Sequence, residues 1–307
     1  MQEDTEINRV LREVSEDFPG KVAAVIQKTY PSPIVVSLIS SQMDADRMDY
    51  LLRDAYFTGV NYGTFDLERI LRVLRPYKGQ IVVKESGMHA IEHYLMSRYQ
   101  MYWQVYFHPV TRSSEIILRQ IFRRAKQLYE GGYSFNWMPN SLKGLFENKL
   151  SVHDYLKLDE ALVQTVFMQW TDERDELLSD LCDRFMNRRL YKYITVDNPD
   201  ESLLDEVSQF FSSIGMEPDY HMEIDFPFDL PYDVYRPDKK EGEKKEKAPI
   251  LLLIGESEIS EISAKSDIIR SITGLHQGQY HLYYPEEPLL RAVHMMPDHL
   301  KKLFKID

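Results

Sequence analysis

The chain has 307 residues, a net charge of -12 and 43% hydrophobic residues, a balance typical of a soluble globular protein with one or two domains. The acidic charge argues against a general nucleic-acid-binding protein, which needs a basic surface. A single cysteine, Cys182, excludes an intrachain disulfide and a cysteine zinc site, and it fits a reducing compartment. No apolar run approaches the roughly 18 residues that span a bilayer, so the sequence predicts a cytoplasmic protein without a membrane partner.

The first half of the chain is predicted to be mostly helical. The first helix places apolar residues at helical spacing, and Pro19-Gly20 is expected to break it. Residues 79–87, with a glycine at each end, favour a short strand, and Pro109 is expected to kink or split the last long helix of this half. Helices are expected, in order, over residues 5–17, 21–30, 32–41, within 41–59, over 67–76 (stopping at Pro76) and over 88–127.

The pattern changes near residue 188. A helix is expected over residues 202–215, and a final helix over 288–304. Residues 238–249 form a charged, low-complexity insertion that predicts a flexible, exposed loop. Strands are expected over residues 190–196, 219–230, 249–255 and 278–286. We therefore predict a mainly α chain, with a helical domain over residues 1–188 and a smaller α+β domain over residues 189–307.

Residues 41–59, SQMDADRMDYLLRDAYFTG, concentrate the candidate chemistry of the chain. At about 100° per residue, one helical sector is apolar and another gathers polar and aromatic side chains: Asp46, Arg47, Tyr50, Asp54 and Phe57. A solvated helix face with i,i+3 and i,i+4 ion pairs is one interpretation. In the other, a carboxylate in a cleft binds a hard metal, while arginine, tyrosine and a second aspartate hold the phosphates and hydroxyls of a substrate.

The segment DADRMDYLLRDAYFTG closely resembles the last metal-ligand helix of HD-domain phosphohydrolases. It is most similar to the deoxynucleoside triphosphate triphosphohydrolase branch, which includes bacterial dNTPases and the mammalian SAM-and-HD-domain protein. TFDLERILRVLRP and HAIEHYLMSRYQMYWQVYFHPV extend the resemblance over about residues 1–130. The resemblance implies an HD-type helical domain and the hydrolysis of a dNTP to deoxynucleoside plus triphosphate. It also implies assembly as a homodimer or homotetramer.

The resemblance implies a role for five residues that would contact the substrate. Arg47 and Arg98 match residues that contact the phosphates, and Tyr50 matches a tyrosine near the phosphates and sugar. Asp54 matches an acid that binds the sugar 3′-hydroxyl. Tyr106 matches a tyrosine that packs against C2′ of the sugar and disfavours a ribose. Charge neutralisation by arginine is what hydrolysis at a triphosphate requires.

The resemblance also implies a divalent metal such as Mg²⁺ or Mn²⁺, held by a histidine, a His-Asp pair and a final aspartate. Asp46 matches that final aspartate. The other three ligands precede it in the family, whereas the first histidine here is His89. We therefore expect an N-terminally truncated member whose helical domain lacks the His and His-Asp segment. We expect it to have little hydrolase activity alone, and no catalytic residue is identified in it.

Three histidines are candidate substitutes for the missing ligands. His153-Asp154 is the one His-Asp dipeptide of the chain, but Ser151-x-x-Asp154 is better explained as a helix start. His89 and His93 lie four residues apart on a predicted helix, a spacing that can bind a metal, yet no third ligand is evident. We favour a helix-surface or cleft role for this pair.

Two alternatives to a hydrolase stay open. In the first, the chain is a non-catalytic nucleotide-binding or oligomerisation module, in which the same arginines, tyrosines and aspartate bind a dNTP without turnover. In the second, the basic clusters at residues 75–78 and 123–126 bind a nucleic acid. The acidic net charge favours a phosphate pocket or a solvated helix end for these clusters instead.

Overall fold

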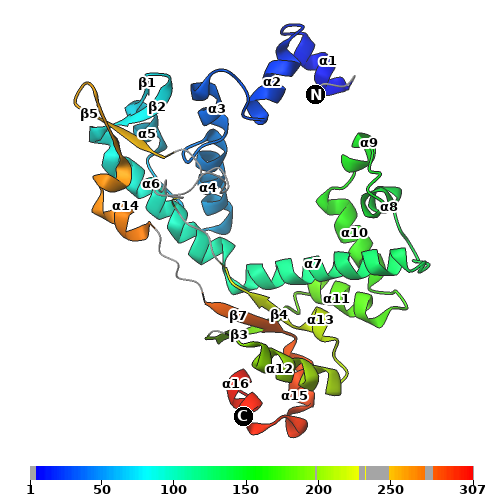
Figure 1. The fold of residues 1–307 in the computed structure, drawn as a ribbon. Coiled ribbons are helices and arrows are strands. Elements are labelled where there is room, and N and C mark those ends of the chain that lie inside the picture. The colour runs from blue at the N-terminus through cyan, green and yellow to red at the C-terminus, as the bar shows by residue number, and fades with distance from the viewer. Residues whose placement is uncertain (1–4, 198, 228–231, 233–248, 274–278, 307) are drawn as a thin grey trace. The chain divides into compact units, whose positions relative to one another are not determined.

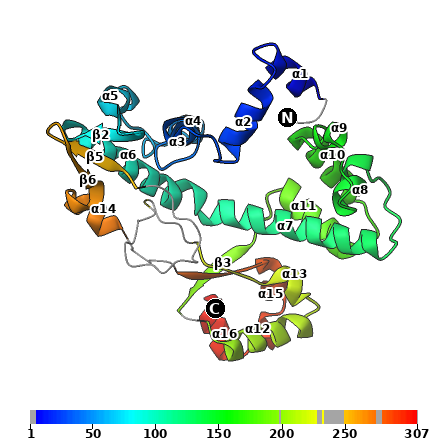
Figure 2. The same cartoon turned by 45° about the horizontal axis from the view of Figure 1, so that its top comes forward.

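The computed structural model describes residues 5–197, 199–227, 232, 249–273 and 279–306 (Figures 1 and 2). It is mainly helical with two small sheets, which confirms the predicted fold class. The chain forms two compact units: unit 1 comprises residues 1–106 and 228–277, and unit 2 comprises residues 107–227 and 278–307. These units do not follow the domain boundary drawn near residue 188 from secondary-structure content, and that boundary stays a prediction. The predicted flexible loop at 238–249 lies, except for Pro249, outside the described residues.

Unit 1 packs helices against one mixed sheet. The sheet has the order β1-β2-β5-β6, and β2 pairs with β5 in parallel, with Val83 opposite Leu252. Its strands are β1 (Leu74–Tyr77), β2 (Gln80–Lys84), β5 (Leu251–Ile254) and β6 (Glu258–Glu261). Its helices are α1 (Glu6–Arg12), α2 (Phe18–Ile26), α3 (Pro33–Ile39), α4 (Ala45–Thr58), α5 (Leu67–Val73), α6 (Met88–Met101) and α14 (Asp267–Ile272), with short 3-10 turns at Glu85–Gly87 and Ile262–Ala264 and a π-helix, η2, at Tyr102–Tyr106.

The core of unit 1 forms where α4 meets α6. Leu51 and Ala55 of α4 and Ile91 and Leu95 of α6 are all buried, as the apolar sector of the 41–59 segment predicts. Gly63 allows this close packing, because a Cβ there would lie 2.8 Å from the Cβ of Ala55 and 2.9 Å from the carbonyl oxygen of Leu51. The two helices that carry the candidate site are therefore held at a fixed separation.

Proline explains two places where the predicted helices of unit 1 were wrong. Pro19 does not break a helix but begins one: it lies in the first turn of α2, where its missing N–H is not needed. The helix predicted over residues 67–76 ends at Val73, and Pro76 lies in β1, at the edge of the sheet, where a strand tolerates proline. In α1 the apolar residues Ile7 and Val10 are exposed, Leu11 is half-buried, and the buried side chain is that of Asn8.

Unit 2 combines a helical layer with an antiparallel sheet of order β3-β7-β4. Its strands are β3 (Lys192–Val196), β4 (Glu223–Asp225) and β7 (Tyr280–Tyr284). Its helices are α7 (Pro109–Glu130), α8 (Asn140–Phe146), α9 (Val152–Tyr155), α10 (Glu160–Trp170), α11 (Glu176–Met186), α12 (Glu201–Ser213), α13 (Pro218–His221), α15 (Glu286–Arg291) and α16 (Asp298–Phe304), with a 3-10 turn at Val293–Met295. The predicted final helix is thus divided, and Pro297 precedes α16.

The sheet of unit 2 has two covered faces. Leu282 and Tyr284 of β7 pack in one core with α12, α15 and α16, which lie together on one side of the strands in Figures 1 and 2. Tyr283, between them, joins a second core with α7, α10 and α11. Alternate side chains of a strand point to opposite faces, so β7 links the two cores. Pro109 starts α7, which confirms the predicted split of the 88–127 stretch.

Candidate functional site

The first turn of α4 holds Arg47 in place through Asp44. Asp44 is the N-cap of the helix: its Oδ1 accepts a 2.8 Å hydrogen bond from the backbone N–H of Arg47, and its Oδ2 accepts one of 3.0 Å from that of Ser41. The guanidinium of Arg47 also donates to the Asp44 carboxylate and to the carbonyl oxygen of Ser41. Arg47 is therefore oriented by its own helix start, and Asp44 is buried by this role.

Tyr106, Asp54 and Tyr50 form one contact group at the other end of α4. The Tyr106 hydroxyl, at the end of the π-helix η2, donates a 2.7 Å hydrogen bond to Oδ2 of Asp54. The Tyr106 ring meets the Tyr50 ring edge-on, with centroids 6.4 Å apart. Burial and the bond to Asp54 raise the pKa of Tyr106, so its hydroxyl keeps the proton that it donates. π-helices frequently mark functional sites.

Arg98 of α6 is buried, with 1% of its surface exposed. Its Nη1 donates a 3.1 Å hydrogen bond to Oε1 of Gln42, and its guanidinium lies over the Tyr102 ring at 5.5 Å from the centroid. Burial lowers the pKa of Arg98, but Tyr102 and Tyr94 raise it further, so the group stays cationic. Burial raises the pKa of Tyr94 further above its ordinary value near 10, so this phenol stays neutral at pH 7 and well above it. The buried charge therefore faces neutral groups.

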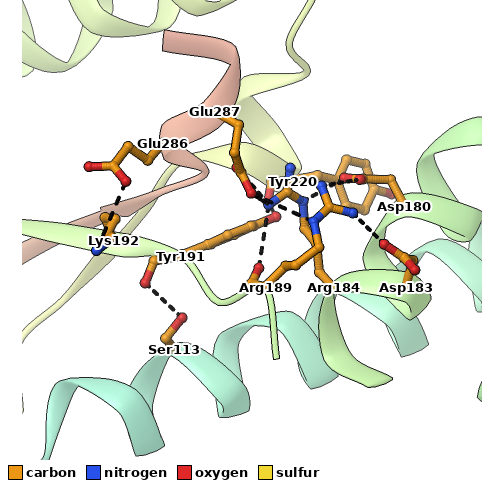
Figure 3. Close-up of polar contacts among 10 residues, drawn as sticks. All are labelled: Ser113, Asp180, Asp183, Arg184, Arg189, Tyr191, Lys192, Tyr220, Glu286 and Glu287. Atoms are coloured by element: carbon orange, nitrogen blue, oxygen red, sulfur yellow. Dashed lines mark hydrogen bonds and ion pairs between the residues drawn. The ribbon is translucent and has the colours of Figure 1, made fainter. Parts of the chain in front are cut away.

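The other buried arginine among the described residues has a different environment. Arg184 of α11 in unit 2 is 2% exposed, but its Nε donates to Asp180 at 2.6 Å and its Nη1 to Glu287 at 3.0 Å (Figure 3). Arg98 has no such carboxylate: within the described part of the chain it forms no ion pair, and its buried Nε has no hydrogen-bond partner. Buried cations are ordinarily paired, so Arg98 is the exception.

Asp46 does not by itself make a metal centre. It lies exposed in the first turn of α4. Across the described ranges, no group of three or more histidine, cysteine, aspartate or glutamate side chains could hold a metal ion. A structural or catalytic divalent ion needs several such ligands, so the donor set of these residues does not fit one. The four-ligand site that the family resemblance implies is represented here by one matching residue.

The candidate substitute ligands do not come together at one site. Two of them lie in contacts that have a structural role. Ser151 caps α9: its Oγ accepts a 3.1 Å hydrogen bond from the N–H of Asp154, which confirms the helix-start interpretation of His153-Asp154. His89 contacts Glu92 through Nδ1 at 2.6 Å, and Ser266 donates a 2.5 Å hydrogen bond to the other oxygen of Glu92. This contact group ties α6 to the start of α14, which is a structural role.

Three residues of the site escaped the sequence analysis: Gln42, Asp44 and Tyr102. Asp44 carried a usable signal, since an aspartate directly before a helix is a favoured N-cap that accepts a hydrogen bond from the N–H three residues on. Tyr102 lies four residues after Arg98 and four before Tyr106, a spacing that places all three on one helix face. Gln42 carried no signal, because its contact with Arg98 joins segments 56 positions apart.

Comparison with known proteins shows what this chain is similar to. Residues 65–133 match the family model of the HD associated region. The chain is 56% identical over 286 residues to the uncharacterized protein YwfO of Bacillus subtilis, covering 92% of this chain and 65% of that protein. It is 21% identical over 160 residues to a deoxynucleoside triphosphate triphosphohydrolase SAMHD1 homolog of Dictyostelium discoideum, covering 52% of this chain and 28% of that one.

The fold is similar to that of a solved phosphohydrolase from Bacteroides thetaiotaomicron, with a TM-score of 0.73, 24% identity and coverage of 90% of this chain and 70% of that chain. The matched family region and the Dictyostelium relative support kinship with HD-domain phosphohydrolases, and the solved structure shows a similar fold. The chain spans less than two thirds of the length of the two curated relatives named above. None of the described helices is long and apolar enough to cross a membrane.

Proposed function

We propose that this chain provides the dNTP-binding wall of a phosphohydrolase that converts a dNTP to deoxynucleoside plus triphosphate. The uncompensated charge of Arg98 carries this proposal. A buried guanidinium needs an anion or several hydrogen-bond acceptors, and the groups that contact it here, Gln42 and Tyr102, carry no negative charge. A triphosphate would supply the missing negative charge. Guanidinium groups bind phosphate oxygens in pairs, which suits this role.

The opposite end of α4 suits a sugar. The carboxylate of Asp54 accepts from Tyr106 through Oδ2, which leaves its other oxygen to accept from a sugar hydroxyl. Tyr50 and Tyr106 present ring edges and faces on which a deoxyribose can pack. Because Arg47 and Tyr50 lie between Asp46 and Asp54 on the same helix, phosphates and sugar would lie along α4. The assignment of the 3′-hydroxyl to Asp54 and of C2′ to Tyr106 rests on the family resemblance.

The residues described here support binding more directly than turnover. HD phosphohydrolases generally use divalent metals, and Asp46 is the one family metal ligand with a match in this sequence. We therefore propose that the chain by itself binds a dNTP without hydrolysing it, the behaviour of a non-catalytic nucleotide-binding module. Assembly as a homodimer or homotetramer stays a prediction, which light scattering of the purified chain tests.

Calorimetric titration of the purified chain with dATP, ATP and inorganic triphosphate tests the proposal. We expect saturable dATP binding, weaker binding of triphosphate because the sugar contacts are lost, and weaker binding of ATP because its 2′-hydroxyl meets Tyr106. The absence of dATP binding would overturn the proposed function. Release of triphosphate from dATP, measured with Mg²⁺ and Mn²⁺, is expected to stay at background, and robust release would refute the non-catalytic state.

A further inference from the structure

Unit 1 contains a cavity that is not lined by the five residues of the proposed nucleotide wall, Arg47, Tyr50, Asp54, Arg98 and Tyr106. It has a volume of about 460 Å³ and lies between α3, the Ser41–Met43 segment, the β1–β2 hairpin and the start of β5. Pockets that bind small molecules typically measure about 300–1,000 Å³, so this cavity has the size of a ligand site. All of its lining residues belong to unit 1.

The walls of this cavity are mostly apolar. Leu38 of α3, Leu74 of β1, Ile81 of β2 and Leu251 of β5 supply aliphatic side chains from four different elements. Strands β1 and β2 are joined by a two-residue turn, and α3 packs against β2, so these walls have a fixed geometry. A ligand with an apolar body would replace water against these side chains, at about 25 cal/mol per Å² of apolar surface buried.

Lys78 is the one charged side chain among the described residues that line the cavity. It forms no ion pair within the described chain, and its ammonium lies over the Tyr77 ring at 5.1 Å. Lys78 and Gly79 form the tight hairpin turn with φ values of 46° and 78°, a left-handed backbone that is unusual for lysine. The hairpin therefore places a free cation at the edge of an apolar cavity, where it complements an anion.

Two residues that line the cavity also form hydrogen bonds with Arg47 and Arg98 of the proposed nucleotide wall. Ser41 and Gln42 line the cavity. In addition, the carbonyl oxygen of Ser41 accepts a hydrogen bond from the Arg47 guanidinium, and Oε1 of Gln42 accepts one from Arg98. The Tyr94 hydroxyl donates a 2.8 Å hydrogen bond to the carbonyl oxygen of Gln42, which fixes this segment. A ligand that presses on Ser41 and Gln42 would therefore act on Arg47 and Arg98.

We propose that this cavity is a regulatory site for a small amphiphilic anion, with a compact apolar body against Leu38, Ile81 and Leu251 and a carboxylate at Lys78. The site differs chemically from the nucleotide wall, since it offers one cation and aliphatic walls where the nucleotide wall offers two arginines, aromatic rings and a carboxylate. Its ligand is therefore not a nucleoside triphosphate. Through the Ser41–Gln42 segment, occupation of the cavity changes the affinity of the chain for its nucleotide.

The direct test is calorimetric titration of the full chain with decanoate, a medium-chain carboxylate, below its micelle concentration. We expect saturable binding of one decanoate per chain. Leu38→Trp, which fills the cavity from α3, should weaken binding about tenfold or more. Ile39→Trp is the matched control, because Ile39 is the next residue of α3, similarly exposed, and does not line the cavity. Lys78→Gln should weaken binding severalfold by removing the charge.

Circular dichroism of each variant checks that it is folded. Absence of saturable decanoate binding to the unchanged chain, or equal binding by the Leu38→Trp and Ile39→Trp chains, overturns the proposal. The regulatory part rests on the proposed function and is tested by titrating dATP with and without saturating decanoate. We expect a severalfold change in dATP affinity that disappears in Leu38→Trp. If decanoate binds but dATP does not bind at all, the nucleotide proposal fails and the cavity remains a ligand site without that effect.

Discussion

Replacing Arg98 with methionine is expected to stabilise the protein and to abolish most of the proposed nucleotide binding. Burying a charge without a partner costs about 3–5 kcal/mol. The substitution gives up the hydrogen bond to Gln42, at about 1 kcal/mol, and the contact with the Tyr102 ring, at about another 1 kcal/mol. Methionine has a similar length and no charge, so Arg98→Met should raise the free energy of unfolding by about 1–3 kcal/mol.

The assay has two readouts on the same variant. Urea unfolding, followed by circular dichroism, should show the higher stability, and dATP affinity should fall about 10- to 150-fold as charge-assisted bonds worth about 1.5–3 kcal/mol are lost. Arg53→Met is the control, because Arg53 is exposed and pairs with Asp49, so both readouts should barely change. A loss of 2 kcal/mol or more of stability in Arg98→Met would refute the reasoning, since it would mean that the charge is already compensated.

Three further predictions concern the packing around the site. Tyr106→Phe keeps the ring contacts but removes the hydrogen bond to Asp54, and it should lower the free energy of unfolding in urea by about 1 kcal/mol; no change would mean that water replaces the bond fully. The Glu92 pKa is lowered, since its bonds to Ser266 and His89 outweigh the effect of burial. The stability that Glu92 contributes is therefore present at neutral pH and is lost as the pH falls below about 4.3 and through the folded-state pKa. The free energy of unfolding of Glu92→Gln should therefore fall less steeply with acid than that of the unchanged chain. Parallel pH profiles for the two chains would contradict this. Gly63→Ala should destabilise by about 1–3 kcal/mol, because its Cβ would collide with α4, whereas Gly20→Ala, with nothing within 4 Å, should be neutral or stabilising in thermal unfolding; equal effects would disprove the close-packing argument.

The sequence predicted element types better than element ends. The core side of α4 followed from its apolar spacing, and Pro109 correctly marked the start of α7. Errors occurred at Pro19 and Pro76, because proline is compatible with a helix start and an edge strand as well as with a break. The strand predicted over residues 219–230 was also wrong at its start, because residues 219–221 lie in the helix α13 and β4 begins at Glu223. Strand β6 was not predicted: its four residues alternate weakly and are stabilised by pairing with β5. Short strands of that kind depend on a neighbour that periodicity does not reveal.

The candidate site was predictable to the extent that it lies on one helix. Asp46, Arg47, Tyr50 and Asp54 are close in sequence, so helical spacing alone brings them together. The partnership of Asp54 with Tyr106 depends on how α4 packs against the segment after α6, which residue spacing within α4 does not contain. The same holds for the burial of Arg98. Its charge is evident in the sequence, but the lack of a carboxylate near it is a property of the folded unit.

The parallel pairing of β2 with β5 has a consequence for synthesis of the chain. Val83 pairs with Leu252, and the ribosome makes all of residues 107–227 after the first of these residues and before the second. At about 5–20 residues per second, the ribosome needs roughly 8–34 s to make the roughly 170 residues between Val83 and Leu252. Throughout that interval the inner edge of β2 has no partner strand, so nascent chains should be most exposed to strand-to-strand aggregation at this edge. Pulse-labelled ribosome-bound chains ending before and after β5 would differ in protease resistance of residues 74–101.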